Sequence, residues 1–278
     1  MGCKIGVFIM SIERLCLEEA GHLVVRSPKY WQLVFTMYLS SLRDALSAKV
    51  LRASYFFCRH IDDVLDGDRY VSDDPKDYVY AILRAMHNES DGPEVVELYR
   101  FAVRHLISLA NTRGEPDKLF RCVIEKAMLF DYKRAQTRRV LTGVELHQYY
   151  DDTFAPVMDL ALMIAGSSLR SVDMPEAVNV QGHLYSVRDL DRDLRGGIIN
   201  IPAEELAKSS INVGRPFGRE EVLADPYLSK WVENEVRIYG EYLSGWRQKL
   251  TDSGARNVCI PLILQMEIFC RLYKLGLY

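Results

Sequence analysis

Two stretches of the chain place aspartates four residues apart, a spacing that puts both carboxylates on one face of a helix. Asp62 and Asp66 form the first pair, with Asp63 beside them, and Asp189 and Asp193 form the second. Like charges at this spacing repel each other by roughly 0.2–0.5 kcal/mol. A divalent cation that bridges the carboxylates would remove this cost. Paired carboxylates of this kind are suited to bind Mg²⁺, which prefers carboxylate oxygens.

Arginines accompany both aspartate pairs. Arg59 precedes the first pair by three residues, and Arg188 and Arg192 alternate with the second. Guanidinium groups bind phosphate oxygens through a planar fork of donors, and Mg²⁺ favours a few carboxylates together with substrate phosphates. This combination is typical of a diphosphate clamp. A solvated helix face with internal ion pairs is the alternative for a single Asp-x-x-x-Asp, but two such ridges with arginine beside each favour the clamp.

The elements that must position these residues are predicted to be helices. Apolar residues recur at steps of three and four before the first pair (Val50, Ala53, Phe57, Ile61, Leu65), and strand-like alternation is scarce. Breaks at proline and glycine divide the chain into nine predicted helices. Their approximate spans are 11–25, 30–66, 75–88, 93–111, 116–137, 143–168, 174–195, 218–251 and 256–275. Short linkers and the lack of low-complexity segments predict one all-α domain over residues 1–278.

Composition and charge bound the classes of partner. The formal charge of −3 spread over 278 residues does not indicate nucleic acid as a partner. No stretch approaches the roughly 18 apolar residues that span a bilayer, so no transmembrane segment is predicted and only peripheral membrane contact stays open. The six cysteines are scattered, which argues against a zinc site or a disulfide framework. Free thiols indicate the cytoplasm.

These motifs resemble those of the squalene/phytoene synthase family. Residues 55–66 read Tyr-x-x-Cys-Arg-x-x-Asp-Asp-x-x-Asp, which is similar to the first acidic motif of that family. Residues 188–202 read Arg-Asp-x-x-x-Asp-x-x-x-Gly-x-x-x-Ile-Pro, which is similar to its second. The resemblance covers roughly residues 30 to 275. It implies an isoprenoid-synthase-type helical bundle around a central cavity.

The resemblance also implies a reaction and the residues that perform it. An allylic prenyl diphosphate would be ionised with the help of Mg²⁺, and an apolar cavity wall would shelter the cation from water. Arg59 and Arg188 would contact phosphate oxygens. The catalytic and metal-binding carboxylates would be those of Asp62, Asp63, Asp66, Asp189 and Asp193.

A basic run follows Asp131 near a predicted helix end and consists of Lys133, Arg134, Arg138 and Arg139. The family has a flexible region that covers the phosphates, and by resemblance this run would be such a lid, with Lys133 as a further diphosphate ligand. A basic run is also typical of a solvated face, so that alternative stays open.

The chain departs from the family pattern after the second acidic pair and in the middle of the sequence. Ile198 and Asn200 stand where the family has Arg and Tyr, and Tyr185 stands where it has Asn. Pro156 and Asp159 fill two glycine positions of a mid-chain pattern. The loss of a guanidinium and a phenol removes donors for a second diphosphate. The bulkier mid-chain residues would narrow the space between helices and add a polar group.

The second substrate is therefore predicted to be a small aromatic molecule, as for the squalene-synthase-like enzymes that prenylate carbazole-type metabolites. Tyr185 and Asn200 are candidates for hydrogen bonds to this acceptor. Asp151, Asp152 and Asp159 are candidates for the base that removes the ring proton, with helix capping or solvation as the alternative. Three other functions compete with this hypothesis: head-to-head condensation of two prenyl diphosphates, terpene cyclisation and a non-catalytic helical subunit.

Overall fold

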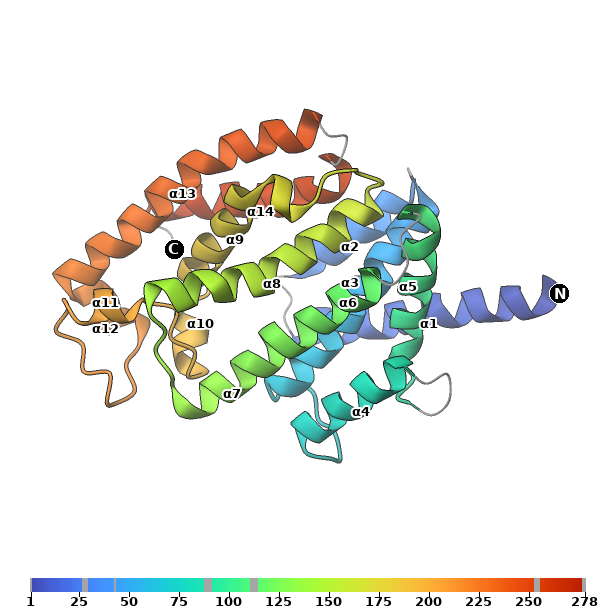
Figure 1. Ribbon diagram of the computed structural model, residues 1–278, viewed down its shortest axis with the longest axis horizontal. Coiled ribbons are helices and arrows are strands. Elements are labelled where there is room, and N and C mark those ends of the chain that lie inside the picture. The colour runs from blue at the N-terminus through green and yellow to red at the C-terminus, as the bar shows by residue number, and fades with distance from the viewer. Residues whose placement is uncertain are drawn as a thin grey trace. The chain divides into compact units, whose positions relative to one another are not determined.

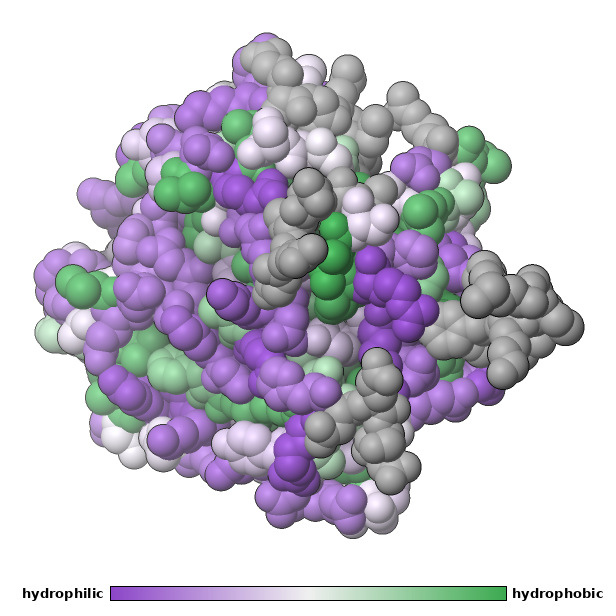
Figure 2. Space-filling model, turned by 45° about the vertical axis from the view of Figure 1, so that its right-hand side comes forward, coloured by the Kyte–Doolittle hydropathy of each residue, from purple (hydrophilic) through white to green (hydrophobic). Residues whose placement is uncertain are grey.

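The computed structural model describes residues 2–26, 30–42, 44–87, 92–110, 115–252 and 256–276, and every regular element among them is helical. This confirms the all-α prediction. The chain divides into two compact units, residues 1–124 with 163–166 and residues 125–162 with 167–278. The prediction of one domain stays a prediction. On the face in Figure 2, hydrophobic residues are scattered among hydrophilic ones. No described helix is long and apolar enough to cross a membrane.

The first unit is organised around α3 (Ala45–Leu65), which carries the first aspartate motif at its C-terminal end. This helix packs against α1 (Gly2–Arg26) and α5 (Val96–Ala110), as Figure 1 allows the reader to follow. The apolar stripe predicted from the sequence is buried, with Val50, Ala53 and Phe57 fully inaccessible to solvent. The other elements of this unit are α2 (Trp31–Leu39), the 3₁₀ turn η2 (Ser40–Leu42), α4 (Pro75–His87) and α6 (Glu115–Cys122).

The single helix predicted over 30–66 is wrong, because the structure has α2 and α3 there. Asp44 adopts an extended backbone conformation (φ −146°, ψ 101°), and its carboxylate accepts hydrogen bonds from the backbone N–H groups of Leu46 and Ser47. This is an N-cap that starts a new helix. The apolar periodicity continues on both sides of Asp44 and therefore conceals the break.

The second unit is built on α9 (Pro175–Arg188) and α13 (Pro226–Asp252), which pack along each other, with α14 (Arg256–Lys274) also against α13. Figure 1 shows α13 in orange as a long helix with α9 beside it. The chain's remaining elements are the π-helical segment η3 (Val123–Met128), α7 (Leu129–Thr137), α8 (Gly143–Ile164), η4 (Ser171–Asp173), α10 (Leu190–Arg195), α11 (Ala203–Leu206) and α12 (Arg219–Ala224).

Three more of the predicted helices are interrupted, and two of the breaks occur at aspartates. The prediction over 116–137 contains the π-helical segment. The prediction over 174–195 breaks at Asp189 (φ −95°, ψ 7°), although its backbone hydrogen bonds continue across the break. The prediction over 218–251 breaks at Asp225, whose carboxylate caps α13 by accepting from the N–H groups of Tyr227 and Leu228.

Candidate metal and diphosphate site

The three aspartates of the first motif differ in their exposure. Asp62 keeps 30 % of its side chain exposed, while Asp63 keeps 6 %. Asp66 is exposed and forms the C-cap of α3, with its backbone N–H bonded to the carbonyl oxygen of Asp62 over 2.9 Å. Asp62 and Asp66 are therefore the more accessible members of the motif, and the side chain of Asp63 is mostly buried.

Arg59 joins two of these aspartates. Its Nη1 lies 2.5 Å from Oδ2 of Asp62, and its Nε lies 2.7 Å from Oδ1 of Asp63. Burial works against the charge of Arg59, but these two carboxylates outweigh it and raise the pKa of the guanidinium above its ordinary value. The Nη2 group of Arg59 is buried and has no hydrogen-bond partner among the described residues. This leaves donor capacity that a phosphate oxygen could use.

Asp63 also faces an open groove of about 1010 Å³ in the first unit. There its Oδ1 lies 2.8 Å from Nη1 of Arg26, which also pairs with Asp68 at 3.0 Å. Arg69 lines the same groove and pairs with Glu19 at 2.5 Å. Asp63 thus lies between the guanidinium groups of Arg26 and Arg59, so protein charges already balance its carboxylate.

The second motif is held by neighbouring side chains in the second unit. Arg188 binds both carboxylate oxygens of Asp189, with Nε 3.0 Å from Oδ1 and Nη2 2.5 Å from Oδ2. Asn200 donates a hydrogen bond from Nδ2 to Oδ2 of Asp193 over 2.9 Å. Arg192 lies further away, with its Nε 3.9 Å from Oδ1 of Asp193 and half of its side chain exposed. Each carboxylate therefore has a dedicated partner that fixes its orientation.

The electrostatics of this pair fit a divalent cation. Burial, and then the negative charge of Asp189, raise the pKa of Asp193 to about 7. A buried carboxylate whose pKa is raised by burial and by a neighbouring negative charge lies in a site that is short of positive charge. Mg²⁺ would supply that charge, and it commonly binds one or two carboxylates while substrate phosphates and water complete its coordination. Among the described residues no three His, Cys, Asp or Glu side chains gather into a complete cation site.

Asn200, the hydrogen-bond partner of Asp193, belongs to a buried chain of polar contacts. The side-chain oxygen of Asn200 accepts a hydrogen bond from Nη2 of Arg134 over 2.7 Å. The same Nη2 lies 3.1 Å from Oδ1 of Asp131, and the hydroxyl of Tyr149 donates to the other Asp131 oxygen over 2.6 Å. The guanidinium of Arg134 is 4.6 Å from the centre of the Tyr149 ring. Only 1 % of the Arg134 side chain is exposed.

Arg134 is therefore neither a lid residue nor part of a solvated face, and both interpretations of the basic run are wrong for it. The one feature of the sequence that indicates this role for Arg134 is the opposite charge of Asp131 three residues earlier on the same helix. Lys133 and Arg139 are exposed, and Arg139 pairs with Glu145 at 2.6 Å. The role of Lys133 as a diphosphate ligand stays a prediction.

A glycine shapes the turn that follows the second motif. Gly197 has φ +83°, and a Cβ atom added to it would lie 2.6 Å from the backbone carbonyl oxygen of Ala135. Both the left-handed backbone and the close approach exclude a side chain here. The turn brings Asn200 back to Asp193, because the N–H of Ile198 bonds the carbonyl oxygen of Asp193 over 2.8 Å.

The predicted acceptor residues lie in different surroundings. The guanidinium carbon of Arg188 lies 4.0 Å from the centre of the Tyr185 ring. The centres of the Tyr185 and Phe154 rings are 5.6 Å apart. Asp152 pairs with Lys126 at 3.1 Å. Asp159 accepts hydrogen bonds from the backbone N–H and the hydroxyl of Ser171. Tyr185 and Asn200 thus lie beside the second motif, whereas Asp152 and Asp159 have partners elsewhere.

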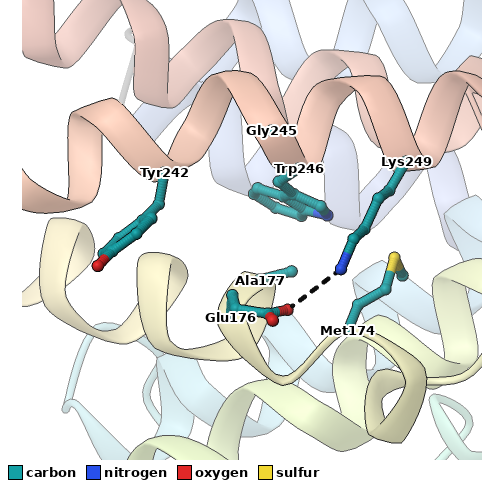
Figure 3. A pocket seen from close by; sticks show the side chains of 7 residues that line it. All are labelled: Met174, Glu176, Ala177, Tyr242, Gly245, Trp246 and Lys249. Carbon is teal, nitrogen blue, oxygen red and sulfur yellow. Dashed lines mark ion pairs between the residues drawn. The ribbon is translucent and has the colours of Figure 1, made fainter.

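A small pocket between α9 and α13 differs in kind from these sites. Figure 3 shows Tyr242 and Trp246 of α13 above Met174 and Ala177, with the ion pair between Glu176 and Lys249 (3.6 Å) at its edge. Its lining is mostly apolar and its volume is about 150 Å³. Pockets that bind ligands of drug size measure about 300–1,000 Å³. It is too small to be the prenyl diphosphate site.

Residues 37–276 match the family model of squalene/phytoene synthase. Both aspartate motifs and all of their partners described above except Glu19 and Arg26 fall within this range. Comparisons with curated proteins and with solved structures gave no match.

Proposed function

The chain belongs to the squalene/phytoene synthase family, and we propose that it transfers the prenyl group of an allylic diphosphate to a non-isoprenoid, aromatic acceptor with the help of Mg²⁺. Family membership implies a transferase that uses isoprenoid substrates, and the family typically uses Mg²⁺. The nature of the acceptor is the step beyond the family. The proposal of an uncharged acceptor is supported by the surroundings of Asn200.

By the resemblance, Asn200 stands where the family has a tyrosine, and both ends of its amide are hydrogen-bonded within the protein. It is buried, donates to Asp193 and accepts from Arg134. Ile198, two residues earlier, offers no guanidinium where the family has an arginine. A head-to-head synthase must bind two diphosphates. A chain that replaces two donors by an alkyl group and an occupied amide is better suited to one diphosphate and an uncharged second substrate.

Each motif supplies groups suited to Mg²⁺ and to phosphate. Asp62, Asp66, Asp189 and Asp193 would hold Mg²⁺, which neutralises the charge that develops on the leaving diphosphate. Arg59 would donate its remaining N–H groups to phosphate oxygens. Other guanidinium and ammonium donors proposed for the phosphates are those of Arg188, Arg192 and Lys133. We assign Asp63 the weaker metal-binding role, since Arg26 and Arg59 already balance its charge.

Aromatic and apolar side chains would receive the prenyl group. In the first unit, α2 exposes Trp31, Phe35 and Leu39 at intervals of four residues, with 45–55 % of each residue accessible, a face suited to an apolar chain. In the second unit, Tyr185 and Phe154 lie next to the second motif through Arg188. The faces of such rings attract cations, so they would stabilise the allylic cation and present the acceptor to it.

The test uses the purified protein with Mg²⁺ and dimethylallyl, geranyl or farnesyl diphosphate, with and without carbazole or indole. We expect pyrophosphate release and a prenylated product that require the aromatic acceptor. A head-to-head hydrocarbon formed without acceptor would overturn the proposal in favour of a phytoene- or presqualene-type synthase, and a cyclic terpene would identify a cyclase.

Two variants test the metal clamp itself. Asp62→Ala and Asp189→Ala should each abolish Mg²⁺-dependent pyrophosphate release. Asp191→Ala is the matched control, because Asp191 lies in the same short helix as Asp193 but is exposed and pairs with Arg195. If Asp191→Ala loses as much activity as Asp189→Ala, the loss reflects damage to α10, and the assignment of Asp189 to the metal fails.

A further inference from the structure

His183 on α9 is held in two directions by a single turn of α13. Its Nδ1 forms a short hydrogen bond with the carboxylate of Glu235. Its ring stacks on Tyr239, with 3.9 Å between the ring centres and 10° between the planes. Glu235 and Tyr239 are four residues apart, so they share one face of α13. One contact fixes the edge of the imidazole and the other fixes its face.

A third contact holds the same ring from α8. Tyr150 meets His183 edge to face at 5.0 Å, and its hydroxyl is hydrogen-bonded to the hydroxyl of Ser186 over 2.7 Å. Tyr150 fits there because position 182 is glycine: a Cβ atom on Gly182 would lie 2.3 Å from the tyrosine ring. The remaining nitrogen of His183, Nε2, has no hydrogen-bond partner among the described residues, and 19 % of the side chain is exposed. An oriented imidazole thus keeps one accessible nitrogen.

We propose that Nε2 of His183 is the general base that takes the ring proton from the alkylated acceptor, and that Glu235 is its positioning residue. The inference rests on the proposed function. When Glu235 accepts the Nδ1 proton, the neutral imidazole has its lone pair on Nε2. The same carboxylate then stabilises the imidazolium that forms, as the carboxylate of a His–acid pair does in other enzymes.

The step balances without any further reactant. The C–O bond of the prenyl diphosphate breaks, and its electron pair leaves with pyrophosphate. Electrons of the aromatic acceptor form the new C–C bond, which places a positive charge on the acceptor ring. The C–H bond at that carbon then breaks, its electrons restore the aromatic system, and the proton moves to Nε2 of His183.

The position of His183 suits this role. A row of rings leads from His183 through Tyr150, Phe154 and Tyr185, with successive centres 5.0, 6.2 and 5.6 Å apart, to the guanidinium of Arg188. His183 lies on α9, six residues before Asp189 at the C-terminal end of this helix. Six residues correspond to about 9 Å along a helix axis. The row therefore links the proposed base to the diphosphate-binding groups through a series of aromatic side chains.

The other titratable groups near the row are less suited to accept the proton. Those that face His183 are Glu235, Tyr239 and Tyr150. Burial, then the charge of Glu235, raise the pKa of Tyr239 to about 12, and burial holds that of Tyr150 above its ordinary value, so both stay neutral phenols. Of the three bases considered from the sequence, Asp152 and Asp159 are engaged with Lys126 and Ser171, and Asp151 lies beside the exposed His147.

The decisive variant is His183→Asn, assayed with protonated and ring-deuterated acceptor. The asparagine amide can still donate to Glu235 near the position of Nδ1, but it lacks Nε2. We expect prenylated product to form roughly 10²–10⁴ times more slowly, which is the usual contribution of a general base to the rate. We also expect the primary isotope effect on cleavage of the ring C–H bond to be larger than in the wild type. His147→Asn is the control, because His147 is an exposed histidine on α8. It should behave like the wild type.

Chemical rescue separates a base from a packing residue. Added imidazole should restore product formation in His183→Ala, where it can enter the space between Tyr239 and Tyr150, and should not stimulate the wild type. Glu235→Gln keeps an acceptor for the Nδ1 proton but removes the charge, and it should lose less activity while showing the same enlarged isotope effect. It also carries the test if the His183 variants do not fold.

The outcomes distinguish this inference from the function on which it rests. If the wild type prenylates an aromatic acceptor and His183→Asn does so at the same rate without an enlarged isotope effect, the base is another group and only this inference fails. Slower turnover in folded variants, with neither imidazole rescue nor an isotope effect, would likewise overturn it in favour of a packing role. If the wild type prenylates no aromatic acceptor, the proposed function fails and the assignment fails with it.

Discussion

The amide nitrogen of Asn200 donates a hydrogen bond to Oδ2 of Asp193 over 2.9 Å. The amide is oriented for this by its other end, since its oxygen accepts from the buried Arg134. Asn200 therefore presents a donor to one carboxylate oxygen and leaves Oδ1 of Asp193 on the side of Arg192. Residues that hold a metal-binding group in this way set its affinity without touching the metal.

Asn200→Leu removes both hydrogen bonds while keeping the branched shape of the side chain. We expect the Mg²⁺ concentration required for half-maximal pyrophosphate release to rise about 10–100-fold, the usual effect of losing a partner of a metal ligand. Asn212→Leu is the control, since Asn212 is exposed in a loop. An unchanged Mg²⁺ requirement in folded Asn200→Leu would show that Asp193 does not depend on this contact, or does not bind the metal.

Arg134→Met should affect the stability of the second unit more than any exposed arginine. It leaves the Asp131 carboxylate and the Asn200 oxygen without their guanidinium partner, and breaking a buried ion pair costs about 3 kcal/mol or more. Arg139→Met is the control, because more than half of the Arg139 side chain is exposed, and it should change stability little. Urea denaturation measures both. Equal midpoints for the two variants would contradict the buried network.

The sequence did not predict the contacts on which these variants and the His183 variants rest, because the contacting residues lie far apart along the chain. Arg134 and Asn200 are 66 residues apart, and His183 and Glu235 are 52 apart. No local period or spacing encodes such pairs. The basic run around Lys133 therefore reads as uniformly surface-exposed, although one of its four members is among the most buried polar residues of the chain.

What the sequence predicted well depends on neighbours within one or two turns. The steps of three and four before the first motif gave the buried face of α3, whereas metal binding by the two aspartate pairs stays a prediction. Helix breaks were missed where a single capping residue decides them, as at Asp44 and Asp225. A cap stabilises a helix end by about 1 kcal/mol, which is enough to end a helix but leaves the apolar period around it unchanged.

The cap at Asp225 predicts a dependence of stability on acid. The backbone N–H groups of Ser210 and Leu228 and the hydroxyl of Ser210 lower the pKa of Asp225 to about 2. A carboxyl group has a pKa of about 3.9 in an unfolded chain. Because the folded value is the lower one, the stabilisation from Asp225 is complete above about pH 4 and is lost as the pH falls through about 2.

Asp225→Asn should therefore be less stable than the wild type at pH 7, and the difference should shrink as the pH falls from about 4 to 2. Urea denaturation at a series of pH values measures the free energy of unfolding of both proteins. A difference that stays constant down to pH 2 would mean that the charge of Asp225 contributes nothing and that only its hydrogen-bond geometry matters.

Gly197→Ala should damage the second motif, and Gly166→Ala separates the causes. Both glycines have positive φ, +83° and +68°, which costs an alanine about 1–2 kcal/mol. At Gly166 a Cβ atom would meet nothing within 4 Å, whereas at Gly197 it would meet the carbonyl oxygen of Ala135 at 2.6 Å. That oxygen belongs to backbone and cannot turn away, so the turn that carries Asn200 must shift. We expect Gly166→Ala to lose stability only, and Gly197→Ala to lose more stability and to need more Mg²⁺ for pyrophosphate release. Equal Mg²⁺ requirements in the two variants would show that the turn does not set the position of Asn200 against Asp193.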